Sequence, residues 1–228
     1  PRIHLSALRP LARRTFNCAH ELGHHEFGHG STIDELRDDA SAEQWHQPNE
    51  VLANAFAAFV LMPTLGLRQA FARRHLTPET ATPTQLYAIA CNFGVGLSTL
   101  TTHMAFGIEA MTPFRRTALA RHTPRSVRAE FLGHPAAEPL ILVDEQWNAP
   151  SLDAEEGHLI WLSNGVQVTG KVLIFERAVQ SGSLFRAIAP GIGRAFHPDG
   201  SWATYVRVAR REYVGLAEYR HLEDATDD

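Results

Sequence analysis

The sequence predicts an α+β protein, with a mainly helical first part followed by a β-rich second part. Up to about residue 110, apolar residues recur at the three- and four-residue spacing of helices. From residue 139 onward the pattern changes to short apolar runs such as 140–143 and 159–162, separated by turns such as Asn164-Gly165. At 228 residues the chain can form one large domain or two smaller ones.

The composition is that of an ordinary globular protein, with 44% hydrophobic and 20% charged residues. The formal net charge of −4 argues weakly against a dedicated nucleic-acid binder. Two cysteines, Cys18 and Cys91, make no disulfide framework, so we expect a reducing, cytoplasmic environment. No apolar run approaches ~18 residues and no signal peptide is recognisable, so no membrane partner is expected. Because the chain opens at Pro1 without Met, we expect its true start to lie upstream or to be processed.

The most informative stretch is residues 15–30, which contains the pattern H-E-x-x-H at His20, Glu21 and His24. Positions four apart on an α-helix differ by about 40° around the axis, so the two imidazoles share one face. That face can present two nitrogens to one Zn²⁺, with Glu21 beside them to take a proton from a metal-bound water. Because two histidines leave the metal short of protein ligands, a third ligand must come from elsewhere.

This pattern lies in a helix predicted from about Leu11 to His29 and stopped by Gly30-Ser31. The metal pair falls on the apolar stripe of that helix, together with Phe16, Ala19, Gly23 and Phe27. His25 and His29 form a second i, i+4 pair off the stripe, and we predict surface histidines there. The flanking segments are predicted to be a strand or extended entry at 1–10 and a polar loop or short helix at 31–48.

The third ligand has two possible sources. One class of zinc peptidases, the metzincins, requires Gly at position eight and His at position eleven, counted from the first His. Phe27 and Gly30 occupy those positions here, and His29 falls one place early, so that class is excluded. The other solution is a glutamate on a later helix, and Glu50 opens one 26 residues after His24.

The helix of Glu50 is predicted over residues 50–62, with Asn49 as its N-cap and Pro63 as its end. Asn54 lies one turn after Glu50 and shares its face. Histidines that bind a metal usually donate their other N–H to an outer acceptor, and the Asn54 side-chain oxygen is a candidate for that role.

These motifs resemble the ImmA/IrrE family of zincin-like metallo-endopeptidases. The residues that carry the resemblance are Arg14-x-Phe16-x-x-Ala19-His20-Glu21-Leu22-Gly23-His24, Gly28-His29, Glu50-x-x-Ala53-Asn54-x-Phe56-Ala57 and Leu61-Met62-Pro63. The resemblance implies a metallopeptidase domain at about 1–76, in which His20, His24 and Glu50 bind Zn²⁺, or alternatively Mn²⁺. It also implies that Glu21 is the catalytic acid and base.

Residues 84–106 predict a helix–turn–helix-like segment, which resembles the segment after the peptidase motifs in the family. It lies in a region, 77–138, whose second half is rich in arginine and proline and is predicted to be a connector. Because 97–106 contain no arginine or lysine, a structural or substrate-docking role is favoured over direct DNA binding. The neighbouring arginines keep DNA binding open as a hypothesis, at positions 115, 116, 121, 125 and 128.

Residues 139–228 predict a β-rich C-terminal domain whose role the sequence leaves unassigned. One branch of the family carries a GAF-like sensor domain at this place, and the β pattern is compatible with that fold and with others.

The resemblance implies an endopeptidase that cuts a specific protein, a helix–turn–helix transcriptional repressor, and so releases stress-response or mobile-element genes. Two alternatives stay open: a non-catalytic regulatory or binding module on a zincin scaffold, and a processing protease of a biosynthetic or toxin–antitoxin locus. Peptidases of this kind often add a side chain that stabilises the oxyanion. The sequence offers four candidates without a choice between them: His103, His158, His197 and Tyr205.

Overall fold

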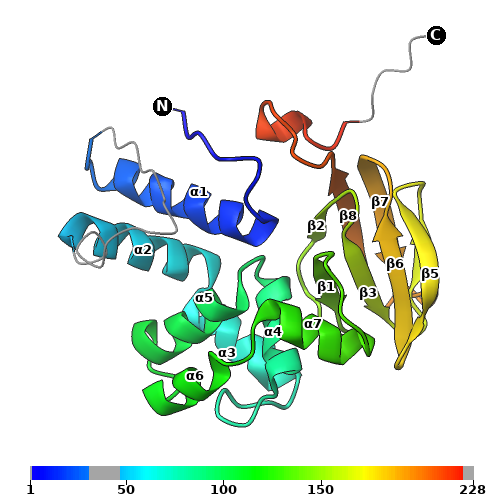
Figure 1. Ribbon diagram of the computed structural model, residues 1–228, viewed down its shortest axis with the longest axis horizontal. Coiled ribbons are helices and arrows are strands. Elements are labelled where there is room, and N and C mark those ends of the chain that lie inside the picture. Colours follow the sequence, from blue (N-terminus) through cyan, green and yellow to red (C-terminus); the bar gives the residue numbers. More distant parts are fainter. Residues whose placement is uncertain (1, 31–46, 223–228) are drawn as a thin grey trace.

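The computed structural model describes residues 2–30 and 47–222. Its α-helices lie within the first 132 residues and gather on one side of the molecule, with the strands on the other (Figure 1). A short 3-10 helix at Ala217–Tyr219 follows the last strand. The α-helices are α1 (Leu11–Glu26), α2 (Pro48–Leu61), α3 (Thr64–Arg73), α4 (Pro83–Asn92), α5 (Leu97–Thr102), α6 (Pro113–Leu119) and α7 (Pro124–Leu132). A π-helix at His103–Gly107 continues α5 directly. The α+β prediction is therefore confirmed.

Proline and threonine define the starts of several helices. Proline occupies the first position of α2, α4, α6 and α7, where its fixed φ suits the helix and its missing N–H costs nothing. Thr82, Thr112 and Thr123 precede α4, α6 and α7, and each accepts a hydrogen bond from the backbone N–H three residues on. The region 113–138, predicted to be a connector, thus contains two capped helices.

The helix of Glu50 begins earlier than the sequence predicts. It starts at Pro48, with Gln47 at the cap, so the prediction that Asn49 is the N-cap is wrong. Pro48 takes the first helical position and places Asn49 inside the first turn. The helix ends before Pro63, as predicted.

The end of α1 also differs from the prediction, since the helix stops at Glu26 and not at His29. Gly28 has a φ of +67°, and its N–H donates to the carbonyl of His25, while the N–H of His29 donates to the carbonyl of His24. These two bonds form a Schellman motif, which reverses the chain at a left-handed glycine. His29 therefore folds back towards the helix.

Residues 1–10 were predicted to be a strand or an extended entry segment. Among residues 2–10 the structure has no strand, so of these two only an entry segment without strand pairing is present. Most of the loop predicted at 31–48 lies outside the described residues. The predicted helix–turn–helix-like segment is α4 and α5, which are joined by a turn at Gly94, whose φ is +64°.

The second part of the chain contains two four-stranded sheets. The strands are β1 (Leu140–Val143), β2 (Ser151–Glu155), β3 (Leu159–Ser163), β4 (Gln167–Thr169), β5 (Leu173–Val179), β6 (Gly182–Ala187), β7 (Gly191–Phe196) and β8 (Ala203–Ala209). Their order is β1-β3-β6-β5 in one sheet and β2-β8-β7-β4 in the other. The pairs β1–β3 and β2–β8 are parallel and the others are antiparallel. A relation of this part to GAF domains stays a prediction.

The helical and β-rich parts share one apolar core. The larger buried cluster runs from Leu86 and Ile89 of α4 to Trp161 of β3 and Leu184 of β6. The hydroxyl of Tyr87 donates to the carbonyl of Leu140 at 2.6 Å across the same contact. The division into 1–76, 77–138 and 139–228 stays a prediction, and the core shows that the last two are packed together.

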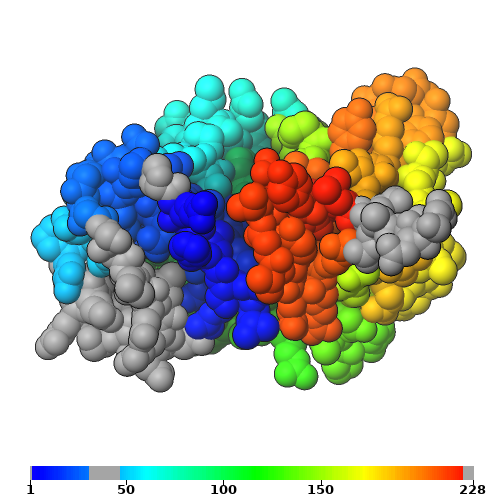
Figure 2. All heavy atoms as spheres, turned by 90° about the horizontal axis from the view of Figure 1, so that it is seen from above, coloured from blue at the N-terminus to red at the C-terminus, as the bar shows by residue number. Residues whose placement is uncertain are grey.

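Two chain segments far apart in sequence are neighbours on one face of the molecule. The first residues of the chain lie beside the segment that follows β8, as Figure 1 and Figure 2 both show. No single helix of the described chain is long and apolar enough to cross a membrane. The helices α2 and α3, which are bent by 42° relative to each other, pass that test only when they are taken together as one span.

Candidate metal centre

The site is built where α1 and α2 pack closely against each other. A Cβ atom added at Gly23 would lie only 3.2 Å from the Cα atom of Ala53 and 3.1 Å from Cδ1 of Phe56. Ala53 and Ala57 are fully buried on this face of α2, whereas Val51, Leu52, Phe59 and Val60 of the predicted apolar pattern are about half exposed. Small residues thus let the two backbones approach, and the histidines between them face α2.

Three donor groups converge in this interface. The Nε2 atoms of His20 and His24 lie 3.0 Å apart, and each lies 3.3 Å from one carboxylate oxygen of Glu50. Both histidines are buried, while the Glu50 side chain is 20% exposed. Among the described residues, this is the one group of three His, Cys, Asp or Glu side chains close enough to share an ion. The predicted trio is therefore brought together.

The outer nitrogens of the two histidines have partners of their own. Nδ1 of His20 lies 3.1 Å from Oδ1 of Asn54, as predicted, and Nδ1 of His24 lies 2.9 Å from Nδ1 of His29. A proton on each outer nitrogen leaves the inner Nε2 lone pairs facing one another and the carboxylate. Such a convergence of lone pairs and negative charge is favourable only around a cation, so the residues fit a bound metal.

Glu21 follows His20 on α1 and is partly exposed. It is therefore the residue next to a candidate ligand in the chain, at a position that water can reach. This is the arrangement that the H-E-x-x-H pattern predicts for a general base.

Residues 1–102 match the family model Peptidase_M78, described as the IrrE N-terminal-like domain. That match identifies residues 1–102, somewhat less than half of the chain, as an IrrE N-terminal-like domain. No curated protein and no solved structure matches the chain significantly. The M78 match covers α1 to α5 and ends before the π-helix, so α6, α7 and all strands lie beyond it.

The match gives residues 1–102 the character of a metallopeptidase-type domain, called the M78 domain below, and such a domain implies a metal. His20, His24 and Glu50 are the residues of this M78 domain that fit it, because their donor atoms converge within reach of a single ion.

The position of one residue beside the candidate metal centre was not predicted. His29 was expected at the surface, but it is only partly exposed and contacts His24 directly. Its signal in the sequence is Gly28, since a glycine after a helix favours the Schellman turn that brings His29 back. His25, the other member of the predicted surface pair, is exposed.

The four candidates for oxyanion stabilisation have different surroundings. His103 is buried, with Nε2 3.1 Å from the carbonyl of Met62, and burial lowers its pKa. His158 lies next to Glu155 at the end of β2. His197 packs edge-on against Trp202, and Tyr205 is exposed on β8. None of these contacts assigns the role to one of them.

The arginines next to the helix–turn–helix-like segment have contacts within the chain. Arg115 donates to the carbonyl of Ala81 at 2.6 Å, and Arg116 donates to the hydroxyl of Thr102 at 3.3 Å and lies over the ring of Phe106. These two side chains therefore contribute to packing α6 against the helices around it.

Proposed function

We propose that the chain is a metal-dependent endopeptidase that hydrolyses a peptide bond in a specific protein substrate. The observation that carries this proposal is the convergence of His20, His24 and Glu50 in an M78 domain, with Glu21 adjacent. A dedicated metal site next to a water-accessible carboxylate is the minimum machinery for metal-assisted amide hydrolysis. The match to a peptidase family and the geometry of the site therefore support the same function.

The proposed metal is Zn²⁺, with Mn²⁺ as the alternative, because two imidazoles and one carboxylate suit both ions. His20 and His24 bind through Nε2, and Asn54 and His29 orient the two rings from behind. When bound, the ion lowers the pKa of a coordinated water to about 7 and polarises the scissile carbonyl.

The side chains of this chain carry the proton transfers. Glu21 accepts the proton of the attacking water and later returns it to the leaving amine. Its partial exposure suits this role, because water can reach the carboxylate.

The proposed substrate is a DNA-binding transcriptional repressor of the helix–turn–helix type, cut in the cytoplasm to release stress-response or mobile-element genes. This choice follows the family resemblance. Direct DNA binding by the chain itself is not part of the proposal, because α5 and the following π-helix carry no lysine or arginine.

The test uses the purified chain loaded with Zn²⁺ and purified candidate repressors of the helix–turn–helix type. Mass spectrometry should find one cleavage site, and Glu21→Gln should abolish cleavage while the zinc content per chain stays unchanged. Glu26→Gln, at an exposed position five residues on along α1, is the matched control and should cut normally. Equal cleavage by Glu21→Gln would contradict the mechanism.

The same experiment separates the two alternatives. Release of the repressor from its DNA by uncut, metal-stripped protein would favour a regulatory binding module. Cleavage of a different substrate, such as a precursor peptide or an antitoxin, would favour a processing protease.

A further inference from the structure

The position of α1 decides the geometry of the metal centre. Two of the three donor residues, His20 and His24, lie on α1 and the third, Glu50, lies on α2. Among the described elements, α2 is the one against which α1 packs extensively. A helix with one extensive packing partner can slide or turn by small amounts. Metal–ligand distances, in contrast, vary by only about 0.2 Å, so such movements would disturb metal binding.

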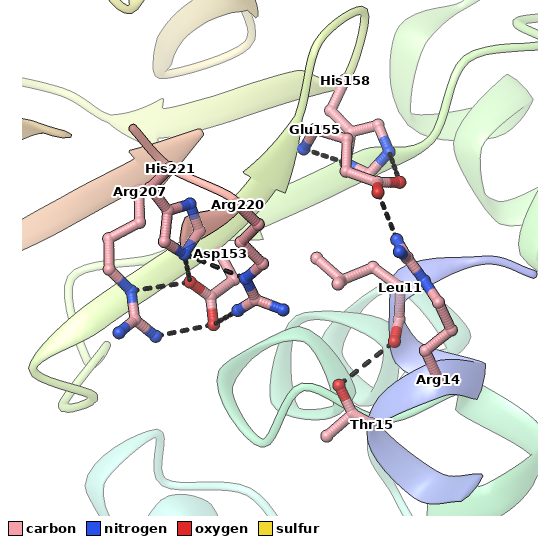
Figure 3. A network of polar contacts seen from close by, with 9 residues as sticks. All are labelled: Leu11, Arg14, Thr15, Asp153, Glu155, His158, Arg207, Arg220 and His221. Atoms are coloured by element: carbon pink, nitrogen blue, oxygen red, sulfur yellow. Dashed lines mark hydrogen bonds and ion pairs between the residues drawn. The ribbon is translucent and has the colours of Figure 1, made fainter. Parts of the chain in front are cut away.

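A second fixed point of α1 is the ion pair between Arg14 and Glu155. Arg14 lies six residues before His20, which is roughly 9 Å along the helix axis. Its Nη2 atom donates to Oε1 of Glu155 at the end of β2, as Figure 3 shows. The two side chains are only 13% and 9% exposed, so this pair joins the M78 domain to the β-rich part in a largely dry place.

Glu155 is held rigidly on the β-rich part. It pairs with Ala209 of β8 and begins a tight turn, in which the N–H of His158 donates to the Glu155 carbonyl and Gly157 has a φ of +86°. The N–H of Glu155 in turn lies 3.3 Å from Nδ1 of His158. The sheet and the turn therefore fix the backbone of Glu155, which carries the carboxylate that Arg14 reaches.

The other arginines of this network bind a different carboxylate. The other carboxylate on the same face of β2, Asp153, is bound by both Nε and Nη2 of Arg207 at 2.7 Å and by Arg220 at 3.1 Å (Figure 3). Among the described residues, Glu155 is the hydrogen-bond partner of the Arg14 guanidinium, whose Nε has none. Displacing α1 would leave two buried charges uncompensated, so the contact resists movement.

The direction of Arg14 connects this contact to the catalytic side of α1. Arg14 and Glu21 are seven residues apart, so their side chains differ by about 20° around the axis and leave the helix on the same side. Holding Arg14 against β2 thus fixes the rotation of the helix face that carries Glu21, and with it the neighbouring histidines.

We infer that Arg14 is a positioning residue of the metal centre. Through its ion pair with Glu155 it sets the rotation and depth of α1, so that the β-rich part controls how tightly the M78 domain binds its metal. This inference rests on the proposed function only in its use of His20, His24 and Glu50 as the metal ligands.

The chain contains a matched control for this ion pair. Arg74 follows α3 and binds Asp144, which follows β1, through Nε and Nη2 at 2.6 and 2.7 Å. These side chains are 6% and 28% exposed. Like the pair of Arg14, this pair joins the helical part to the β-rich part, but it does not touch α1.

The test measures Zn²⁺ affinity by competition with a chromophoric chelator, and the visible absorption spectrum of the Co²⁺-loaded chain. We expect Arg14→Gln to lower Zn²⁺ affinity about tenfold or more and to change the Co²⁺ spectrum. Glu155→Asp keeps the charge and withdraws the carboxylate by one methylene, and it should change the spectrum with little loss of folding. Arg74→Gln should lower the unfolding midpoint but leave affinity and spectrum at wild-type values.

Two results with the variants would overturn the inference alone. One is wild-type Zn²⁺ affinity and Co²⁺ spectrum in both folded variants, or in Glu155→Asp alone should Arg14→Gln not fold. The other is an equal loss of affinity in Arg74→Gln, which would mean that the contact acts only through general stability. A wild-type chain that binds no metal would contradict this inference and the proposed function together. A chain that binds zinc through this linkage but cuts no protein would contradict the proposed function alone.

Discussion

Nδ1 of His24 lies 2.9 Å from Nδ1 of His29, across the turn that ends α1. With one proton shared between these atoms, the outer side of His24 is satisfied and its inner Nε2 is free to bind an ion. His20 has the equivalent support from Asn54 at 3.1 Å. Each histidine of the centre is therefore oriented from behind by a different residue type.

Removal of His29 should weaken the centre without unfolding α1. We expect His29→Ala to lower Zn²⁺ affinity by about tenfold, because the loss of an outer partner of a metal-bound histidine typically costs 10–100-fold. Competition with a chelator measures the Zn²⁺ affinity. His25→Ala is the control, since His25 is exposed, and its affinity should stay at the wild-type value. Equal affinities of the two variants would show that the contact of His29 with His24 has no role in binding.

The close approach of α1 and α2 should make Gly23 sensitive to a single methyl group. Within a helix, Gly→Ala normally stabilises by about 1 kcal/mol. At Gly23 the added Cβ would meet the backbone of Ala53 at 3.2 Å, and overpacking of this kind costs about 1–3 kcal/mol. We expect Gly23→Ala to lower both the urea midpoint and the Zn²⁺ affinity.

Gly66 of α3 is the control for this substitution. Its nearest neighbours would be side-chain atoms of Pro63 and Phe93 at 3.3 and 3.4 Å, which have more freedom to move than a backbone. Gly66→Ala should keep or slightly raise the urea midpoint. A Gly23→Ala variant that is more stable than wild type, with unchanged affinity, would contradict the close packing.

His158 should make the β-rich part sensitive to acid. Burial, with the charges of Arg14 and Arg211, lowers the pKa of His158 from 6.5 to about 4, although Glu155 lies nearby. Below pH 6.5 the unfolded chain takes up a proton that the folded chain refuses, so stability falls as the pH falls towards 4. From about pH 7.5 to 5 this group should cost about 2 kcal/mol of unfolding free energy.

The measurement is the difference in unfolding free energy between wild type and His158→Gln at both pH values, with a metal chelator present. Titrations that the two proteins share cancel in this difference. Loss of stability on acidification should be about 2 kcal/mol smaller in the variant. The same loss in both proteins would show that His158 is not kept neutral by its surroundings.

The core of the site could be predicted from sequence because it depends on helix periodicity. His20 and His24 are one turn apart on α1, and Glu50 and Asn54 are one turn apart on α2, so four side chains are placed once two helices are recognised. The structure brings these four together. Their roles in binding and catalysis stay predictions until metal and activity are measured.

The features that sequence patterns missed depend on chain reversal and on contacts distant in sequence. His29 reaches His24 only because a left-handed Gly28 ends the helix, whereas a helix continued to residue 29 places it elsewhere. The helices α6 and α7 were hidden in a segment rich in arginine and proline, although Thr112-Pro113 and Thr123-Pro124 are helix-start signals.

The β-rich part shows a different limit. Short apolar runs mark β1 and β3, whereas charged residues or glycines interrupt the apolar residues of β2, β6 and β7, and these three strands were not predicted. Parallel pairing of β2 with β8 brings Ser151 opposite Tyr205, 54 positions apart in register, and no local pattern encodes that. The link of Arg14 to Glu155 depends on that pairing, so it too was beyond prediction.

The proposed metal centre is tested most directly by an anomalous difference map at the zinc edge, from crystals of the chain grown with Zn²⁺. We predict one peak between α1 and α2, at about 2.0–2.2 Å from Nε2 of His20, Nε2 of His24 and a carboxylate oxygen of Glu50. A peak bound instead by other residues, or no peak at these three atoms in fully loaded protein, would contradict the assignment of the metal ligands.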